Sequence, residues 1–228
     1  MDGQAVRRNR KKCRNSKECR NGKRGGMEEK RALRKQILAL RDAMLVEERE
    51  EKSRRIMEKL VSMPLYDQSD IILAYVNYRS EVNTTDLVNR ALADGKRVFA
   101  PKVSGETMEF YRLNGMEDLR EGYKGIREPA SEGIFDAGAA MVHTLMLMPG
   151  AVFDEKCHRI GYGKGFYDRY LKHISEKGIS VYTLAVCYEC QVLSEIPFEK
   201  HDVRPRAILT ETRFRTCSDR ADGERNRP

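Results

Sequence analysis

LMLMPGAVFDEKCHRIGYGKGFYDRYL, residues 145–171, is the stretch that decides the fold of this chain. Its apolar start, residues 145–148, is followed by Pro149-Gly150 and predicts a buried strand. Its end, residues 166–171, predicts the start of a helix. Between them lies a glycine-rich loop, residues 161–165, whose backbone N–H groups can converge on an anion. The stretch therefore predicts a strand–loop–helix unit of an α/β protein, with an anion site at its loop.

Predicted helices and strands alternate on both sides of this unit. Helical spacing of apolar residues or short apolar runs predict helices at 28–44, 47–61, from 84 or 85 to 94, and 166–176, and strands at 71–76, 97–100, 108–113, 181–187 and 207–210. Alternating strands and helices predict a mostly parallel, Rossmann-like sheet covered on both faces, in a single three-layer α-β-α domain. Residues 114–140 lack a clear pattern and predict a long loop that is mobile or part of a site.

The basic charge of the chain lies at its N-terminus. Residues 1–26 hold ten Lys or Arg and two acidic residues, whereas the remainder holds 33 of each sign. We therefore expect a disordered basic extension at 1–26, a folded domain at 27–213 and a polar C-terminal tail at 214–228. A nucleic-acid contact through the extension is an alternative function, but a solvated extension is the simpler interpretation.

The cysteines and the hydropathy predict a cytoplasmic protein. The six cysteines are spread along the chain without a compact framework of pairs, which predicts reduced thiols. Cys187 and Cys190 have the spacing of half a zinc site, but we interpret them as small core residues. No apolar run is long enough to span a bilayer, and the N-terminus has no hydrophobic signal core. We expect a monomer that binds neither membranes nor nucleic acid.

Charged residues around the glycine loop favour a phosphate ligand. The loop matches neither the dinucleotide fingerprint nor the Walker A pattern, and a tight turn is the alternative interpretation. Lys164 supplies a point charge for phosphate, Arg159 a bidentate fork, and Asp168 a hard oxygen ligand for Mg²⁺. Asp168 would also suit the first turn of a helix for electrostatic reasons alone. Glu81 and Asp202 flank other predicted strands, where ligands of open α/β sheets bind.

Several motifs, in order, resemble the 5-formyltetrahydrofolate cyclo-ligase family, also called methenyltetrahydrofolate synthetase. They are K-x-x-x-R at 30–34, SEV at 80–82, PGAVFD at 149–154, RIGYGKGFYDR at 159–169 and HDV at 201–203. The likeness extends over residues 30–212. It implies an enzyme that couples ATP hydrolysis, with Mg²⁺, to the cyclisation of 5-formyltetrahydrofolate to 5,10-methenyltetrahydrofolate.

The resemblance also implies a role for each matching residue. ATP phosphates would be held by a set of cations and loop glycines, namely Lys30, Arg34, Arg159, Gly161, Gly163, Lys164 and Gly165. Lys164 and Arg159 would act on the transferred phosphoryl group. The reduced folate would meet Val76, Glu81, Tyr162 and Phe166, and the metal would be held by Asp168 and Asp202.

Two residues depart from the family pattern. Cys157 stands where the family usually has Gly, and it would be strained if that position needs a positive φ. Arg206 stands where an Asp is usual, so the metal site could be weaker, or only a surface pair could differ. A non-catalytic member of the same fold that binds folate or nucleotide is therefore the alternative to the enzyme.

Overall fold

The computed structural model describes residues 18–136, 143–199 and 202–217. The helices are α1 (Glu18–Asp42), α2 (Val46–Val61), α3 (Pro64–Asp67), α4 (Thr85–Ala93) and α5 (Phe166–Glu176). The strands are β1 (Ile71–Leu73), β2 (Arg97–Ser104), β3 (Thr107–Leu113), β4 (Leu119–Glu121), β5 (Arg127–Pro129), β6 (Thr144–Met148), β7 (Val152–Asp154), β8 (Arg159–Ile160), β9 (Tyr182–Val186), β10 (Val192–Leu193), β11 (Ala207–Leu209) and β12 (Phe214–Thr216). The predictions for residues 1–17, His201 and residues 218–228 lie outside the described residues.

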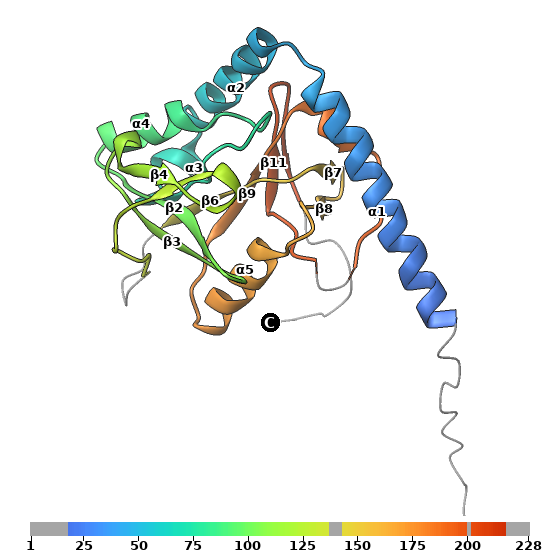
Figure 1. The fold of residues 1–228 in the computed structure, drawn as a ribbon. Helices are drawn as coiled ribbons and strands as arrows, with labels where there is room; N and C mark the ends of the chain where they lie inside the picture. Colours follow the sequence, from blue (N-terminus) through green and yellow to red (C-terminus); the bar gives the residue numbers. More distant parts are fainter. Residues whose placement is uncertain (1–17, 137–142, 200–201, 218–228) are drawn as a thin grey trace, which may run out of the picture.

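Seven strands form the central sheet in the order β12-β11-β9-β6-β1-β2-β3 (Figure 1). The five inner strands are parallel to one another. The two edge strands, β3 and β12, are antiparallel to theirs. The prediction of a mostly parallel α/β sheet is therefore confirmed.

Side chains of the inner strands alternate between two cores, one on each face of the sheet. In β1, Ile72 packs in a core with residues of α2 and α4, whereas Ile71 and Leu73 pack in a second core with residues of α5. In β6 the two leucines join the first core and the two methionines the second. This alternation is the expected consequence of strand geometry when helices cover both faces. The three-layer α-β-α arrangement is therefore present, as predicted.

Helix α1 runs along one side of the molecule past β7 and β8 (Figure 1). Its Ile37 is buried in a small separate core with Val152 and Ile160. The helix begins at Glu18, inside the segment for which the sequence predicts disorder. No helix within the described residues is long and apolar enough to cross a membrane.

Two other segments are more ordered than their sequences predict. Strand β12 lies in the predicted polar tail, where its backbone pairs with β11 although none of its side chains is buried. Within the predicted loop at 114–140, β4 and β5 form an antiparallel pair. Backbone pairing at an edge needs no apolar side chains, so hydropathy does not reveal it.

The prediction of reduced cysteines is wrong for one pair. Cys157 and Cys217 form a disulfide, with Cα atoms 5.8 Å apart. They are separated by 60 positions in the sequence, so their pairing depends on the fold. Cys187 and Cys190 are free thiols, and Cys187 is buried in a small core with Phe153 and Ile208.

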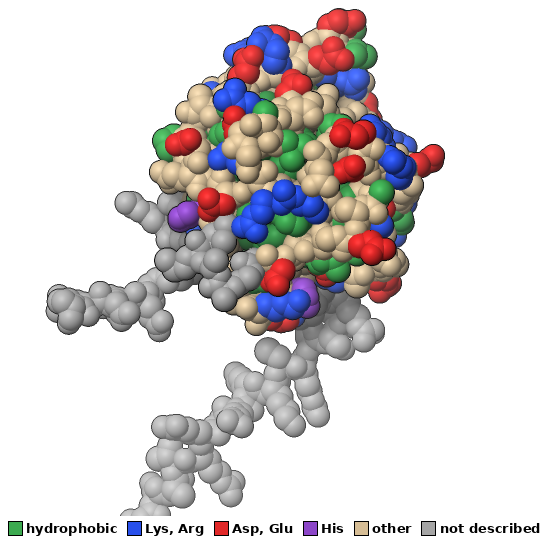
Figure 2. Space-filling model, turned by 90° about the vertical axis from the view of Figure 1, so that its left-hand side faces the viewer, with side chains coloured by type: hydrophobic (Ala, Val, Ile, Leu, Met, Phe, Trp, Pro, Cys, Tyr) green, Lys and Arg blue, Asp and Glu red, His purple; other side chains and the backbone are tan. Residues whose placement is uncertain are grey.

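Charges of both signs cover the face turned to the viewer in Figure 2. Lys and Arg side chains are interspersed with Asp and Glu, and a basic group near the centre borders hydrophobic side chains. This mixture agrees with the balance of charges that the sequence gives beyond residue 26.

Candidate functional site

The candidate site lies where the chain leaves β1 and β6, the two strands at the centre of the sheet. From β1 the sheet continues to β2 on one side and to β6 on the other. Ligands of open α/β sheets bind at such a switch point, beyond the carboxyl ends of the strands. The segment that contains Glu81 follows β1, and the glycine loop follows β6, β7 and β8. These two segments are the walls of the candidate site.

The glycine loop needs glycine at two of its positions. Gly163 and Gly165 have φ values of 91° and 63°, a conformation that other residues rarely adopt. A Cβ at Gly161 would lie 3.0 Å from Arg159 Nη1, and one at Gly163 would lie 3.7 Å from the guanidinium nitrogens of Arg34. A side chain at Gly161 would therefore crowd Arg159, whereas a Cβ at Gly163 would lie at ordinary contact distance from Arg34.

Helix α1 brings three cations to the site from far away in the sequence. Arg34 Nε donates to the Gly161 carbonyl oxygen at 2.7 Å, which places α1 against the glycine loop. Lys30 Nζ lies 2.6 Å from Asp202 Oδ2. Arg41 Nη1 donates to Tyr162 Oη at 2.8 Å. Arg41 is not among the residues predicted for the site, although positions 30, 34 and 41 share one face of a helix.

Arg159 and Asp168 form the buried base of the site. Arg159 is buried, and its Nη2 lies 2.8 Å from Asp168 Oδ1. The same carboxylate oxygen accepts a hydrogen bond from the Val203 backbone N–H at 3.2 Å. Asp202 precedes Val203, so the two carboxylates predicted to hold a metal lie on adjoining segments. Arg206 does not join them; its guanidinium carbon lies 5.8 Å from the centre of the Tyr182 ring.

These residues fit a polyphosphate with a divalent cation. Arg159 Nε and Tyr167 Oη are buried without a hydrogen-bond partner among the described residues, and such groups are costly unless a ligand or water satisfies them. The exposed Lys164 ammonium has no ion-pair partner in the part of the chain that the structure describes. Mg²⁺ is typically held by one or two carboxylates together with phosphate oxygens, which Asp168 and Asp202 could supply.

Glu81 forms a buried acidic centre on the opposite wall. Its Oε2 accepts the Tyr78 backbone N–H at 2.8 Å, and the residue is buried. Burial raises the pKa of Glu81, whereas Tyr162, the Tyr78 N–H and the Arg41 charge act in the opposite direction. Burial also raises the pKa of Tyr162 well above its ordinary value. Glu81, Arg41 and Tyr162 therefore form one coupled polar group.

The residues predicted to bind the substrate differ in their burial and in their contacts. Val76 is half-buried and packs against the core, whereas Tyr162 is 41% exposed, with its hydroxyl oxygen 2.8 Å from Arg41 Nη1. Phe166 begins α5, and its ring meets that of Tyr123 edge-on, with centres 6.0 Å apart. Tyr123 belongs to the segment predicted as a long loop, so this segment reaches the site. In the sequence, Tyr123 stands out as an aromatic residue beside Lys124 and Gly125, but nothing there indicates that it contacts Phe166.

Replacing Glu81 with Gln should change how stability depends on pH. Because the folded state raises the pKa of this carboxyl, the unfolded chain loses the proton first as pH rises above about 4.3. The wild type should therefore lose stability relative to Glu81→Gln between about pH 4 and about pH 7. Urea unfolding at both pH values measures the difference. Glu58→Gln, at an exposed position of α2, is the matched control; parallel pH dependences for wild type and Glu81→Gln would contradict this prediction.

Comparison with known proteins gives one consistent family. A family model described as the 5-formyltetrahydrofolate cyclo-ligase family matches residues 26–211. The 5-formyltetrahydrofolate cyclo-ligase of Mus musculus is 28% identical over 197 residues, which cover 80% of this chain and 93% of the mouse protein. The probable 5-formyltetrahydrofolate cyclo-ligase of Schizosaccharomyces pombe is 31% identical over 166 residues, which cover 68% of this chain and 81% of the yeast protein.

Solved structures agree with this result. The 5,10-methenyltetrahydrofolate synthetase of Aquifex aeolicus superposes with a TM-score of 0.73 at 30% identity, covering 86% of this chain and 96% of that one. The synthetase of Mycoplasma pneumoniae, at 23% identity and a TM-score of 0.63, supports the fold alone. The family model spans most of the chain, and the matched range includes the glycine loop and the cations around it. The chain therefore belongs to the 5-formyltetrahydrofolate cyclo-ligase family.

Proposed function

We propose that this chain is an enzyme that cyclises 5-formyltetrahydrofolate to 5,10-methenyltetrahydrofolate and converts ATP to ADP and phosphate. The observation that best supports the proposal is the convergence of Arg34 and Arg159 on the glycine loop, beside the buried Glu81 group. A cation-lined loop next to a polar, partly apolar wall suits a polyphosphate and a heterocycle bound side by side. The proposal includes Mg²⁺ as the metal and the cytoplasm as the location.

The chemistry explains why such a site needs no protein nucleophile. The formamide oxygen of the substrate is a poor leaving group, and transfer of the γ-phosphoryl group to it makes it leave as phosphate. The N10 amine then attacks the activated carbon, and the imidazoline ring closes. Phosphoryl transfer of this kind depends on positioning and on neutralising charge. A site of Lys, Arg, Gly and Asp supplies both.

Each wall of the site has a role in this proposal. Lys164 and Arg159 neutralise the charge on the transferred phosphoryl group, and Arg34 and Lys30 hold the phosphates from α1. Glu81 offers a hydrogen bond to the polar heterocycle. The folate packs against three apolar or aromatic side chains, those of Val76, Tyr162 and Phe166. When Mg²⁺ is bound, Asp168 and Asp202 would hold it against the phosphates.

The decisive test mixes the purified full-length protein with Mg-ATP and 5-formyltetrahydrofolate. We expect an increase in the near-UV absorbance of the methenyl product that requires ATP, and omission of ATP is the control. Folded protein that gives no absorbance change under several buffer conditions would contradict the enzyme assignment. Calorimetric binding of ATP or folate without turnover would instead favour the non-catalytic alternative.

A further inference from the structure

The Cys157–Cys217 disulfide joins the turn before the glycine loop to the edge of the sheet. The distance of 5.8 Å between the two Cα atoms is ordinary for a disulfide. The Cys217 backbone N–H donates to the Arg206 carbonyl at 2.8 Å, immediately after β12. One sulfur therefore belongs to the sheet edge, and the other belongs to the turn that leads to Arg159. The reaction proposed above uses neither sulfur.

The turn holds Cys157 in a conformation that favours glycine. Cys157 has a φ of 64° and is fully buried. A non-glycine residue in this region is strained and persists only where its surroundings hold it. The strain that the sequence analysis anticipates at this position is therefore present, and the disulfide is one of the bonds that maintain it.

A buried carboxylate organises the same turn. Asp154 Oδ1 accepts the backbone N–H groups of Lys156 and His158 at 2.9 and 2.8 Å, and its Oδ2 lies 2.8 Å from His158 Nδ1. Arg159 follows directly and reaches Asp168. The disulfide and Asp154 thus act on the two residues that precede Arg159, so a change at Cys157 is transmitted to the cation at the base of the site.

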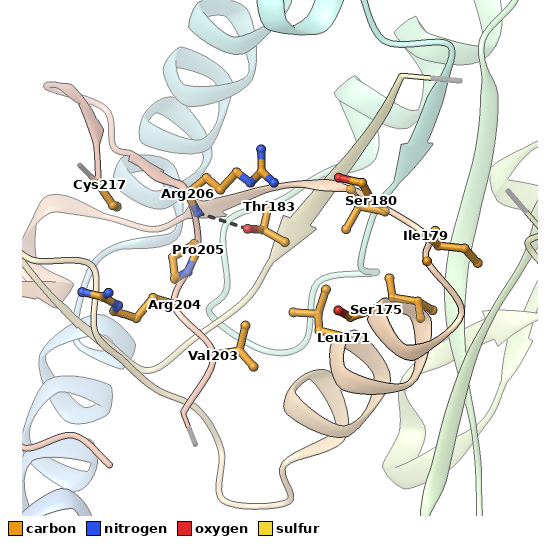
Figure 3. Close-up of a pocket in the computed structure, with 13 residues that line it drawn as sticks. Leu171, Ser175, Ile179, Ser180, Thr183, Val203, Arg204, Pro205, Arg206 and Cys217 are labelled. Atoms are coloured by element: carbon orange, nitrogen blue, oxygen red, sulfur yellow. Dashed lines mark hydrogen bonds between the residues drawn. The ribbon is translucent and has the colours of Figure 1, made fainter. Parts of the chain in front are cut away.

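The disulfide can be reached from the Cys217 side. Cys217 lines a cavity of about 560 Å³ between α5 and residues 203–206, whereas Cys157 is buried. Figure 3 shows Arg204 and Arg206 among the residues that line this cavity. Neither guanidinium pairs with a carboxylate among the described residues. Their charge favours an anionic small thiol as the reagent.

We propose that the Cys157–Cys217 disulfide is a thiol-exchangeable clamp that keeps Arg159 in position for ATP. A thiolate attacks Cys217 Sγ, the Cys157–Cys217 bond breaks, and Cys157 leaves as a thiolate that takes up a proton. A second thiolate then attacks the reagent's sulfur in the mixed disulfide and releases Cys217. Two thiols are oxidised to one small disulfide, and the protein gains two thiols. Reduction lets the turn leave the positive-φ conformation, which lowers the population that binds ATP.

The kinetic part of this inference rests on the proposed function. Full-length protein reduced with glutathione should have a KM for ATP about tenfold higher than that of the oxidised protein. The two kcat values should agree within about twofold, because saturating ATP restores the binding-competent conformation of the turn. Alkylation and peptide mapping report the state of each cysteine. Hydrogen exchange of the amides at 155–159 should be faster in the reduced protein, whether or not the protein turns over folate.

Three variants separate the bond from the backbone. Cys217→Ser keeps Cys157 but loses the bond. With or without glutathione, it should have the higher KM for ATP and the rapid hydrogen exchange of the reduced wild type. Cys157→Gly loses the bond, but glycine adopts the positive φ without strain. Its KM for ATP should therefore equal that of the oxidised wild type, and glutathione should not change it. Cys190→Ser, a partly exposed free thiol, is the matched control and should respond to glutathione as the wild type does.

The outcomes keep the two proposals apart. Absence of turnover in the oxidised protein, the reduced protein and all variants would contradict the enzyme assignment. The hydrogen-exchange rates at 155–159 would still support or contradict the clamp. Equal KM and equal exchange at 155–159 in the oxidised and reduced proteins would overturn the clamp. So would peptide mapping that finds no Cys157–Cys217 bond under oxidising conditions. If Cys217→Ser does not fold, oxidised and reduced wild type provide the same comparison.

Discussion

Lys164→Ala should lower kcat/KM for ATP by about 10²–10³-fold, the loss typical when one preorganised charge is removed from a reacting group. Lys164 lies in the glycine loop, is exposed, and has no ion-pair partner among the described residues. Its charge is therefore available to a phosphate and contributes little to folding. The free energy of unfolding should change by no more than about 0.5 kcal/mol, so the melting temperature should stay close to that of the wild type. Steady-state kinetics and thermal unfolding measure the two effects.

Lys172→Ala is the matched control for this change. Lys172 is on the same helix that follows the loop, and its side chain is 78% exposed. Activity should be unaffected, since the one ion pair of Lys172 among the described residues is with Glu176, at 3.9 Å. An unfolded Lys164→Ala protein would indicate that the lysine is structural. Full turnover by a folded variant would remove Lys164 from the proposed chemistry.

Asp168→Asn should have the second large effect, a fall in kcat of about 10²-fold or more, together with a higher Mg²⁺ requirement. The substitution keeps the shape of the side chain but removes the negative charge that faces Arg159 at 2.8 Å. It also removes the charge of one of the two carboxylates that we propose to hold Mg²⁺. A Mg²⁺ titration of the turnover rate measures the shift in half-saturation.

Asp86→Asn tests the simpler electrostatic explanation. Asp86 lies in the first turn of α4, as Asp168 lies in the first turn of α5, and it is exposed. Both substitutions remove a favourable interaction with a helix N-terminus. Only Asp168→Asn should change the Mg²⁺ titration. The same small loss of stability in both variants, with the Mg²⁺ dependence intact, would show that Asp168 serves the helix alone.

The elements around the glycine loop could be predicted because their signals are local. The apolar run of β6, the glycines at positive φ and the amphipathic α5 each occupy a short window of sequence. Helix α4 and the antiparallel β3 follow from the same kind of pattern. The candidate residues of the loop, and those of the β1 wall, were therefore placed by local signals combined with the family motifs.

The remaining features depend on contacts between distant segments. Lys30 meets Asp202 across 172 positions, and Cys157 meets Cys217 across 60. No periodicity or spacing in one segment identifies its partner in another. Strand β12 has no buried side chains, so its place at the sheet edge is decided by backbone hydrogen bonds to β11. Arg41 was missed because a charge on a helix face is usually solvated.

The contact between Lys30 and Asp202 also has a consequence for protein synthesis. Helix α1 leaves the ribosome first, whereas its carboxylate partner lies near the C-terminal end of the described chain. N-terminal segments are made before the segments they pack against, at about 5–20 residues per second. A nascent chain that stops before Asp202 has α1 but lacks the carboxylate that pairs with Lys30. Nucleotide binding at the proposed site therefore requires synthesis of the chain through Asp202.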